Sequence, residues 1–229
     1  MPPTEPPTDR PTDQPAPPTT SLYDVLHRRR DVRGEFTGEP IPDEVLRRVL
    51  TAAHSAPSVG LSQPWDYVLV RDEATRRSFR EHVLAERDVF DAKLSGERAE
   101  TFARIKVEGI MESTLCVAVT YDPERGAPEV LGRHAIADAG LYSVCLSIQN
   151  LWLAATAEGL GVGWVSFYRE DFLRRLLEIP EGVRPVAWLC VGPVREFAGS
   201  PDLERHGWRN RLPLDDVVHY DKYARGPER

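Results

Sequence analysis

The sequence lacks most of the features that would link it to a metal, a membrane or a nucleic acid. Only three of its 229 residues are cysteines, Cys116, Cys145 and Cys190, and each lies in an apolar run without the close Cys/His spacing of a zinc site or a disulfide framework. The formal net charge is -7, with acidic and basic residues interleaved, which argues against a phosphate backbone or an anionic membrane as the main partner. We therefore predict no metal, no nucleic acid and no membrane.

No basic stretch followed by an apolar run opens the sequence, so we expect no secretory signal and a cytoplasmic protein. Residues 1–20 consist mainly of Pro, Thr, Asp and Gln, and such a segment buries too little apolar surface to offset the entropy of ordering. We predict a disordered tail over 1–20 and a single folded domain over 21–229, a size that supports one core.

The remaining sequence mixes helical and extended patterns without the regular alternation of a doubly wound sheet. Helices are expected from Ser21 to about Asp31, over 41–57 and over 171–177; strands are expected over 66–71, 115–121, 164–167 and 186–191. This order favours an α+β fold with a central mixed or antiparallel sheet flanked by helices.

Residues 73–112 are charged and helical in pattern, with a break at Ser95 and Gly96. Their apolar positions are sparse for an element at the centre of a core, so we predict a lid or an excursion from the domain over about 73–112.

Residues 139–157 contain 13 apolar residues among 19 and no charge. Polar side chains scattered through the segment and the lack of flanking basic residues argue against a membrane span. A helix that is hydrophobic all round must be covered on every side, and a second copy of the chain is an economical cover. We therefore predict a homodimer.

Three clusters are candidates for chemistry. Residues 28–33 hold four arginines near a helix end, where the planar guanidinium suits either phosphate or surface carboxylates. Residues 56–65 form a loop in which Gly60 would allow a backbone N–H to approach a ligand closely. Residues 159–166 follow a helix and lack the last glycine of a dinucleotide fingerprint, so they do not fit a Rossmann turn.

Together, the order and spacing of these clusters resemble the nitroreductase-like flavoproteins. The matching segments are an Arg-rich helix end at 29–33, Ala-Pro-Ser at 56–58, Gln-Pro-Trp at 63–65, a buried interface helix at 149–155, a Gly-rich turn at 159–166 and a basic pair, Arg209 and Arg211. The resemblance covers 21–218 and implies an FMN-dependent fold and an obligate-type homodimer.

Within this family, four stretches are similar to the members that convert reduced FMN and oxygen into 5,6-dimethylbenzimidazole, the lower ligand of vitamin B12, with release of a four-carbon sugar phosphate. The stretches are 29–36, 56–60, 161–166 and 207–214. Typical nitroreductases have Ser in place of Asp31 and Asn in place of Leu61. The resemblance implies reduced FMN as both cofactor and substrate, O₂ as co-substrate and a separate flavin reductase as partner.

Such a reaction needs a base near the ribityl C1′ and a backbone donor near the flavin N5. We assign the base to Asp31, a supporting hydrogen bond to Ser166 and the backbone donor to Gly60. The residues expected to hold the flavin are Arg29, Arg30, Asp31, Val32, Arg33, Ser58, Gly60, Gln63, Pro64, Val165, Ser166, Arg209 and Arg211. Residues 63–65 could face the flavin of either subunit.

Three other functions remain open at this point. The first is an NAD(P)H-dependent nitroreductase or flavin reductase, which Asp31 and Leu61 disfavour. The second is a flavin carrier without chemistry, in which a carboxylate among phosphate-binding arginines would weaken affinity. The third is a dimeric helical interaction module.

Overall fold

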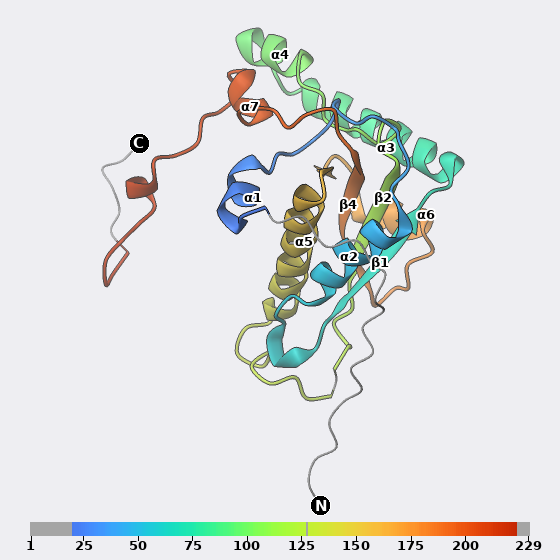
Figure 1. Cartoon of the computed structure of the whole chain (residues 1–229), viewed down its shortest axis with the longest axis vertical. Helices are drawn as coiled ribbons and strands as arrows, with labels where there is room; N and C mark the ends of the chain where they lie inside the picture. Colours follow the sequence, from blue (N-terminus) through green and yellow to red (C-terminus); the bar gives the residue numbers. More distant parts are fainter. Residues whose placement is uncertain (1–19, 127, 224–229) are drawn as a thin grey trace, which may run out of the picture.

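The structure, a computed structural model, describes residues 20–126 and 128–223 and is built on a four-stranded antiparallel sheet (Figure 1). The strands, in the spatial order β1-β2-β4-β3, are β1 Trp65–Val70, β2 Leu115–Tyr121, β4 Arg184–Pro193 and β3 Leu160–Val165. This confirms the predicted α+β fold with a central sheet. Strand β3 starts earlier than expected, because Gly161 and Gly163 lie within it. The predicted tail falls outside the described residues except for Thr20.

Helices flank this sheet. They are α1 Leu22–Arg28, α2 Asp43–His54, α3 Glu73–Asp91, α4 Gly96–Ala103, α5 Ala139–Ala157, α6 Glu170–Leu176 and α7 Asp202–Arg205, with short 3₁₀ turns at Val59–Leu61 and Leu214–Asp216. The Ser21 hydroxyl caps α1 by accepting a 3.3 Å hydrogen bond from Asp24 N. Among the helices of the described residues, none has the length and apolar character needed to cross a membrane.

The two faces of the sheet bury two separate cores. On β2, Val117 and Val119 belong to the core shared with α2 and α5, whereas Cys116 and Ala118 belong to the core shared with α3 and α6. This alternation follows from the period of two along a strand. Figure 1 shows α2 and α5 on one side of the sheet and α3 and α6 on the other.

Helix α3 is more deeply built into the domain than its sequence suggested. Phe79 and Val83 are fully buried, and the Phe79 ring stacks on Trp188 with ring centroids 3.8 Å apart. The expectation that the apolar positions of this segment are too sparse for a central core element was therefore wrong for α3. Phe79 and Val83 lie four positions apart, so they share one face of the helix although α3 has few apolar residues. A lid role for 73–112 stays a prediction.

Candidate functional site

The segment that carries the arginine cluster lies along the edge of the sheet. Beyond α1, Asp31 forms a parallel bridge with Val162 of β3, and Val32 N donates a 3.0 Å hydrogen bond to Val162 O. A Cβ on Gly163 would overlap the Val32 carbonyl oxygen, and one on Gly161 would lie 2.9 Å from Val32 Cγ2. These two glycines therefore let the segment reach the strand; they do not form a phosphate loop.

Asp31 is fixed from two directions at this edge. Its Oδ1 accepts a 3.0 Å hydrogen bond from Trp164 N, and its two oxygens accept hydrogen bonds of 2.5 and 2.6 Å from Arg33. Burial alone would lower the pKa of Arg33, but the charge of Asp31 and its hydrogen bonds raise it overall. Arg33 thus stays charged and orients the carboxylate.

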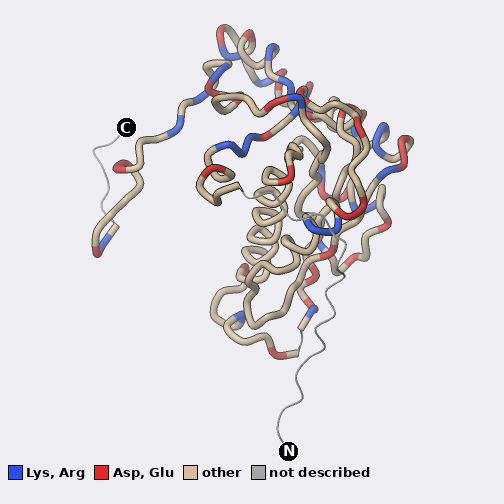
Figure 2. The backbone as a smooth tube through the Cα atoms, in the orientation of Figure 1, with Lys and Arg blue, Asp and Glu red and all other residues tan. Residues whose placement is uncertain are grey.

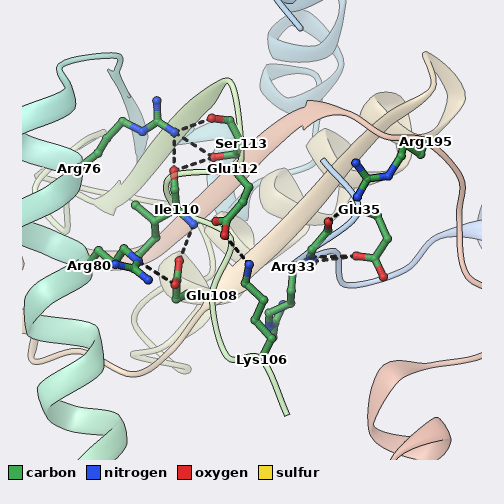
Figure 3. Close-up of polar contacts among 11 residues, drawn as sticks. Arg33, Glu35, Arg76, Arg80, Lys106, Glu108, Ile110, Glu112, Ser113 and Arg195 are labelled. Carbon is green, nitrogen blue, oxygen red and sulfur yellow. Dashed lines mark hydrogen bonds and ion pairs between the residues drawn. The ribbon is translucent and has the colours of Figure 1, made fainter. Parts of the chain in front are cut away.

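The turn after Arg33 is closed by Glu35. Its Oε2 accepts hydrogen bonds from Arg33 N at 3.3 Å and from Gly34 N at 3.0 Å (Figure 3). Burial would raise the pKa of Glu35, but these N–H groups and the charge of Arg205 lower it overall. An ionised Glu35 therefore holds the backbone that presents Arg33.

Arg30 and Arg29 have different roles within the cluster, which Figure 2 draws in blue at the end of α1. Arg30 donates hydrogen bonds of 2.7 Å to the carbonyl oxygens of His27, Arg29 and Gly199, so its guanidinium ties α1 to the C-terminal segment. Arg29 lies over the Trp152 ring, 4.9 Å from its centroid. Burial lowers the pKa of Arg29, and although Asp31 opposes this, the charges of Arg211 and Arg30 lower it further. Excess positive charge of this kind suits an anion.

A cavity of about 440 Å³ opens beside these groups. Its lining residues are Arg29, Arg30, Asp31, Arg33, Phe90, Phe102, Ile105, Lys106, Val107, Trp164, Ser166, Phe167, Pro201, Asp202, Leu203, Trp208 and Arg211. The cavity combines a basic region with an aromatic wall, and its volume lies in the range of small-molecule sites. It brings together six residues that the sequence predicted: Arg29, Arg30, Asp31, Arg33, Ser166 and Arg211.

The other eleven lining residues were not predicted as site residues; they include Phe90, Phe102, Lys106, Phe167 and Trp208. The first three come from 73–112, which lies outside the motif matches. The sequence did contain an indication for Trp208, because it lies within the stretch 207–214 that resembles the family, between Gly207 and Arg209.

The other predicted residues are not on this cavity. Ser58, Gly60, Gln63 and Pro64 lie in the loop between α2 and β1, Arg209 is exposed, and Val32 and Val165 are buried behind the lining. Within one chain, the predicted site residues therefore lie partly at the cavity and partly in the loop between α2 and β1.

The loop between α2 and β1 has an unusual backbone. Gly60, Leu61 and Gln63 all have positive φ, a conformation that costs a non-glycine residue free energy. A Cβ on Gly60 would lie 2.8 Å from Leu131 N, so glycine is also required for packing on the 130–131 segment. Arg125 secures the loop by donating a 2.7 Å hydrogen bond to Trp65 O. Strain held by such contacts is typical of a functional loop.

The structure has an antiparallel sheet between two helical layers and an arginine-rich cavity at the edge of the sheet. This architecture is the one expected for a nitroreductase-like protein. Residues 26–193 match the model of the Nitroreductase family, and the chain belongs to this family. Within it, the chain is 41% identical over 185 residues to the 5,6-dimethylbenzimidazole synthase of Rhodospirillum rubrum, covering 81% of this chain and 87% of the relative. It is 38% identical over 196 residues to the 5,6-dimethylbenzimidazole synthase of Rhodobacter capsulatus, covering 85% of this chain and 94% of the relative. The predicted family resemblance is confirmed.

Solved structures support the same fold. Iodotyrosine deiodinase bound to FMN and 3-iodo-L-tyrosine superposes with a TM-score of 0.69 at 24% identity, covering 89% of this chain and all of that one. The NADPH:FMN oxidoreductase of Vibrio harveyi superposes with a TM-score of 0.65 at 19% identity, covering 89% of this chain and 78% of that one. At these identities the likeness shows the fold alone.

Proposed function

We propose that this chain is a 5,6-dimethylbenzimidazole synthase that converts reduced FMN and O₂ into the benzimidazole. The observation that carries the proposal is the carboxylate of Asp31, which Trp164 N and Arg33 aim at a cavity with a cationic region. Relatives that are 35–41% identical over most of the chain carry the same activity.

The cavity has the donor set that FMN requires. Arg29 and Arg211 bring positive charge that Asp31 does not balance, which suits a phosphate dianion. The aromatic wall of Phe102, Phe167 and Trp208 suits a planar ring. Reduced FMN, when bound, supplies both the electrons for oxygen and the atoms of the product.

Asp31 is the residue that takes up a proton from the ribityl C1′. A carboxylate offers about four lone pairs; Oδ1 uses two for Trp164 N and Arg33, and Oδ2 uses one for Arg33. One lone pair of Oδ2 therefore remains for the proton. Ser166 lines the same cavity, and its assigned role is to hydrogen-bond the ribityl region of the bound FMN.

The direct test is product formation. Purified protein is mixed with chemically reduced FMN, air is admitted, and 5,6-dimethylbenzimidazole is sought by chromatography and mass. Product in amounts that depend on the protein supports the synthase. If only oxidised FMN returns, the proposal fails, and reduction of this oxidised FMN by NADPH on the protein would then identify a nitroreductase or flavin reductase. Tight flavin binding with neither reaction would identify a carrier.

Replacing Arg29 tests the phosphate assignment. We expect Arg29→Gln to weaken FMN binding by about 10- to 100-fold, the size of one charge-assisted hydrogen bond of about 1.5–3 kcal/mol. Riboflavin, which lacks the phosphate, should bind equally to both proteins. Arg77→Gln, at an exposed arginine of α3 paired with Glu73, is the matched control. Equal loss of FMN and riboflavin affinity would show that Arg29 shapes the cavity without contacting the phosphate.

The same proposal includes a homodimer, because two apolar surfaces remain uncovered in one chain. On α5, Tyr142 and Leu146 are 55% and 47% exposed. Beyond α7, the chain extends away from the domain (Figure 1) and exposes the side chains of Leu212, Leu214, Val217 and Tyr220. Apolar side chains on an extended segment are stabilised when they pack on a second copy. This arrangement would also let the loop at Gly60 meet the cavity of the partner.

A charge on α5 tests the dimer. We expect Leu146→Asp to convert the protein to a monomer in sedimentation, because a buried carboxylate at the interface costs several kcal/mol. Cys145 is exposed in one chain, and the other two cysteines are buried. It should therefore react slowly with a thiol-reactive dye in the wild type and quickly in Leu146→Asp. Val89→Asp on α3, where the valine is also 47% exposed, should leave both properties unchanged. A wild-type monomer with a reactive Cys145 would contradict the dimer.

A further inference from the structure

The connection between β3 and α6 carries two residues of the cavity lining and is anchored at its far end by a histidine. Ser166 and Phe167 line the cavity, Tyr168 packs against the core, and Arg169 is the N-cap residue of α6. From α3, the Nε2 atom of His82 accepts a 3.0 Å hydrogen bond from Arg169 N. The connection is therefore attached to α3 directly after the residues that face the cavity.

The neighbours of His82 fix the orientation of its ring. The ring stacks on Phe172 of α6, with ring centroids 3.9 Å apart and an angle of 7° between the planes. Because Nε2 accepts the hydrogen bond, the neutral ring carries its proton on Nδ1. A second contact supports the same joint, since Arg169 Nε donates a 2.9 Å hydrogen bond to Glu86 Oε1. Helix α3 therefore holds the start of α6 through one backbone group and one side chain.

The hydrogen bond from Arg169 N exists only while His82 is neutral, because a protonated ring has no acceptor. Burial lowers the pKa of His82, and the charges of Arg169 and Arg175 lower it further. The carboxylates of Glu86 and Asp171 oppose this shift without reversing it. Since the ordinary pKa of histidine is about 6.5, the ring is neutral at neutral pH. The link is therefore intact at neutral pH and is lost as the pH falls through the lowered pKa.

We propose that His82 is a positioning residue for the cavity, because the hydrogen bond that it accepts from Arg169 N fixes the connection that presents Ser166 and Phe167 to the ligand. The inference rests on the proposed function, which supplies FMN as the ligand. A connection that is free to move must be ordered when the ligand binds, and this ordering weakens binding. A connection already fixed by His82 avoids that cost and holds Ser166 in place for the reaction.

The test separates the acceptor from the ring, using the full-length protein. His82→Phe keeps an aromatic ring to stack on Phe172 and removes the acceptor, whereas the amide oxygen introduced by His82→Gln can still accept the hydrogen bond. The loss of one hydrogen bond changes an equilibrium constant by about fivefold. We therefore expect His82→Phe to weaken binding of oxidised FMN by up to about fivefold at about pH 8, where histidine is neutral, and to lower benzimidazole formation from reduced FMN. His82→Gln should restore most of both.

The pH profile gives a readout that a purely structural role would not change. The FMN affinity of the wild type should fall as the pH is lowered from about 8 to about 5, in part because His82 becomes protonated. That part should be absent from His82→Gln and His82→Phe, which do not titrate at this position, whereas the other titrating groups are common to all three proteins. Glu86→Gln should move it to lower pH, since the charge of Glu86 raises the pKa of His82.

His134→Gln is the matched control, because His134 is exposed between β2 and α5 and does not line the cavity. It should keep the wild-type profile. Wild-type FMN affinity in folded His82→Phe, even with a lowered unfolding temperature, would show that His82 only stabilises the fold and would overturn the inference. A loss of affinity at acid pH that is as large in His82→Gln as in the wild type would overturn it as well. If the wild type forms no benzimidazole while His82→Phe still weakens FMN binding, the proposed function fails and this inference stands.

Discussion

Asp31→Asn is expected to bind FMN and to form almost no 5,6-dimethylbenzimidazole. Asparagine keeps the shape of aspartate, and its carbonyl oxygen can still accept the hydrogen bond from Trp164 N. It cannot accept a proton at physiological pH, and removing a general base costs about 10²- to 10⁴-fold in rate. FMN affinity should be unchanged or higher, because Arg33 loses its counter-ion and the cavity becomes more positive.

The measurement is product yield per turnover from reduced FMN in air, together with an independent FMN titration. Asp88→Asn, an exposed carboxylate of α3, controls for the loss of a negative charge. Ser166→Ala should be impaired less severely than Asp31→Asn, because a lost hydrogen bond costs less than a lost base. Normal yield from Asp31→Asn would remove the base assignment and leave Asp31 with the structural task of orienting Arg33.

Several elements could be predicted from the sequence because local pattern alone determines them. The bounds of β2 at Leu115–Tyr121 and of α5 at Ala139–Ala157 match the expected ranges, since each is an uncharged apolar run. Six of the seventeen residues that line the cavity could be predicted as well. Arg29, Asp31 and Arg33 lie on one short segment, so their proximity needs no knowledge of the tertiary fold.

The aromatic wall depends on long-range packing, which no local pattern encodes. Phe90 and Phe102 come from α3 and α4, Phe167 follows β3, and Trp208 follows α7; their rings meet at centroid distances of 5.0–6.4 Å. The packing role of Gly161 and Gly163 could not be predicted for the same reason. Their partner, Val32, is more than a hundred residues away in sequence. Arg30 differs, because its position near the cavity could be predicted but its hydrogen bonds could not. Its guanidinium donates to three backbone carbonyl oxygens.

Gly163→Ala should destabilise the protein and displace Asp31 together. The added methyl would overlap the Val32 carbonyl oxygen, which belongs to the backbone and cannot turn away as a side chain can. Overpacking of this kind costs about 1–3 kcal/mol, and we expect the upper end of this range in urea unfolding. Movement of Val32 also moves Asp31 from Trp164 N, so benzimidazole formation should fall in the protein that remains folded. Gly182→Ala is the matched control, since a Cβ there meets no atom within 4 Å.

A second pair of variants separates backbone displacement from simple crowding. At Gly161 the added methyl would meet side chains, Val194 Cγ1 and Val32 Cγ2. Truncation of the first neighbour in Gly161→Ala/Val194→Ala should therefore recover part of the lost free energy of unfolding. The same truncation should do nothing for Gly163→Ala, because the obstacle there is a carbonyl oxygen. If Val194→Ala rescued both variants equally, the two glycines would act only by making room in the core. Failure to rescue Gly163→Ala would tie that glycine to the position of Asp31, and so to the chemistry of the site.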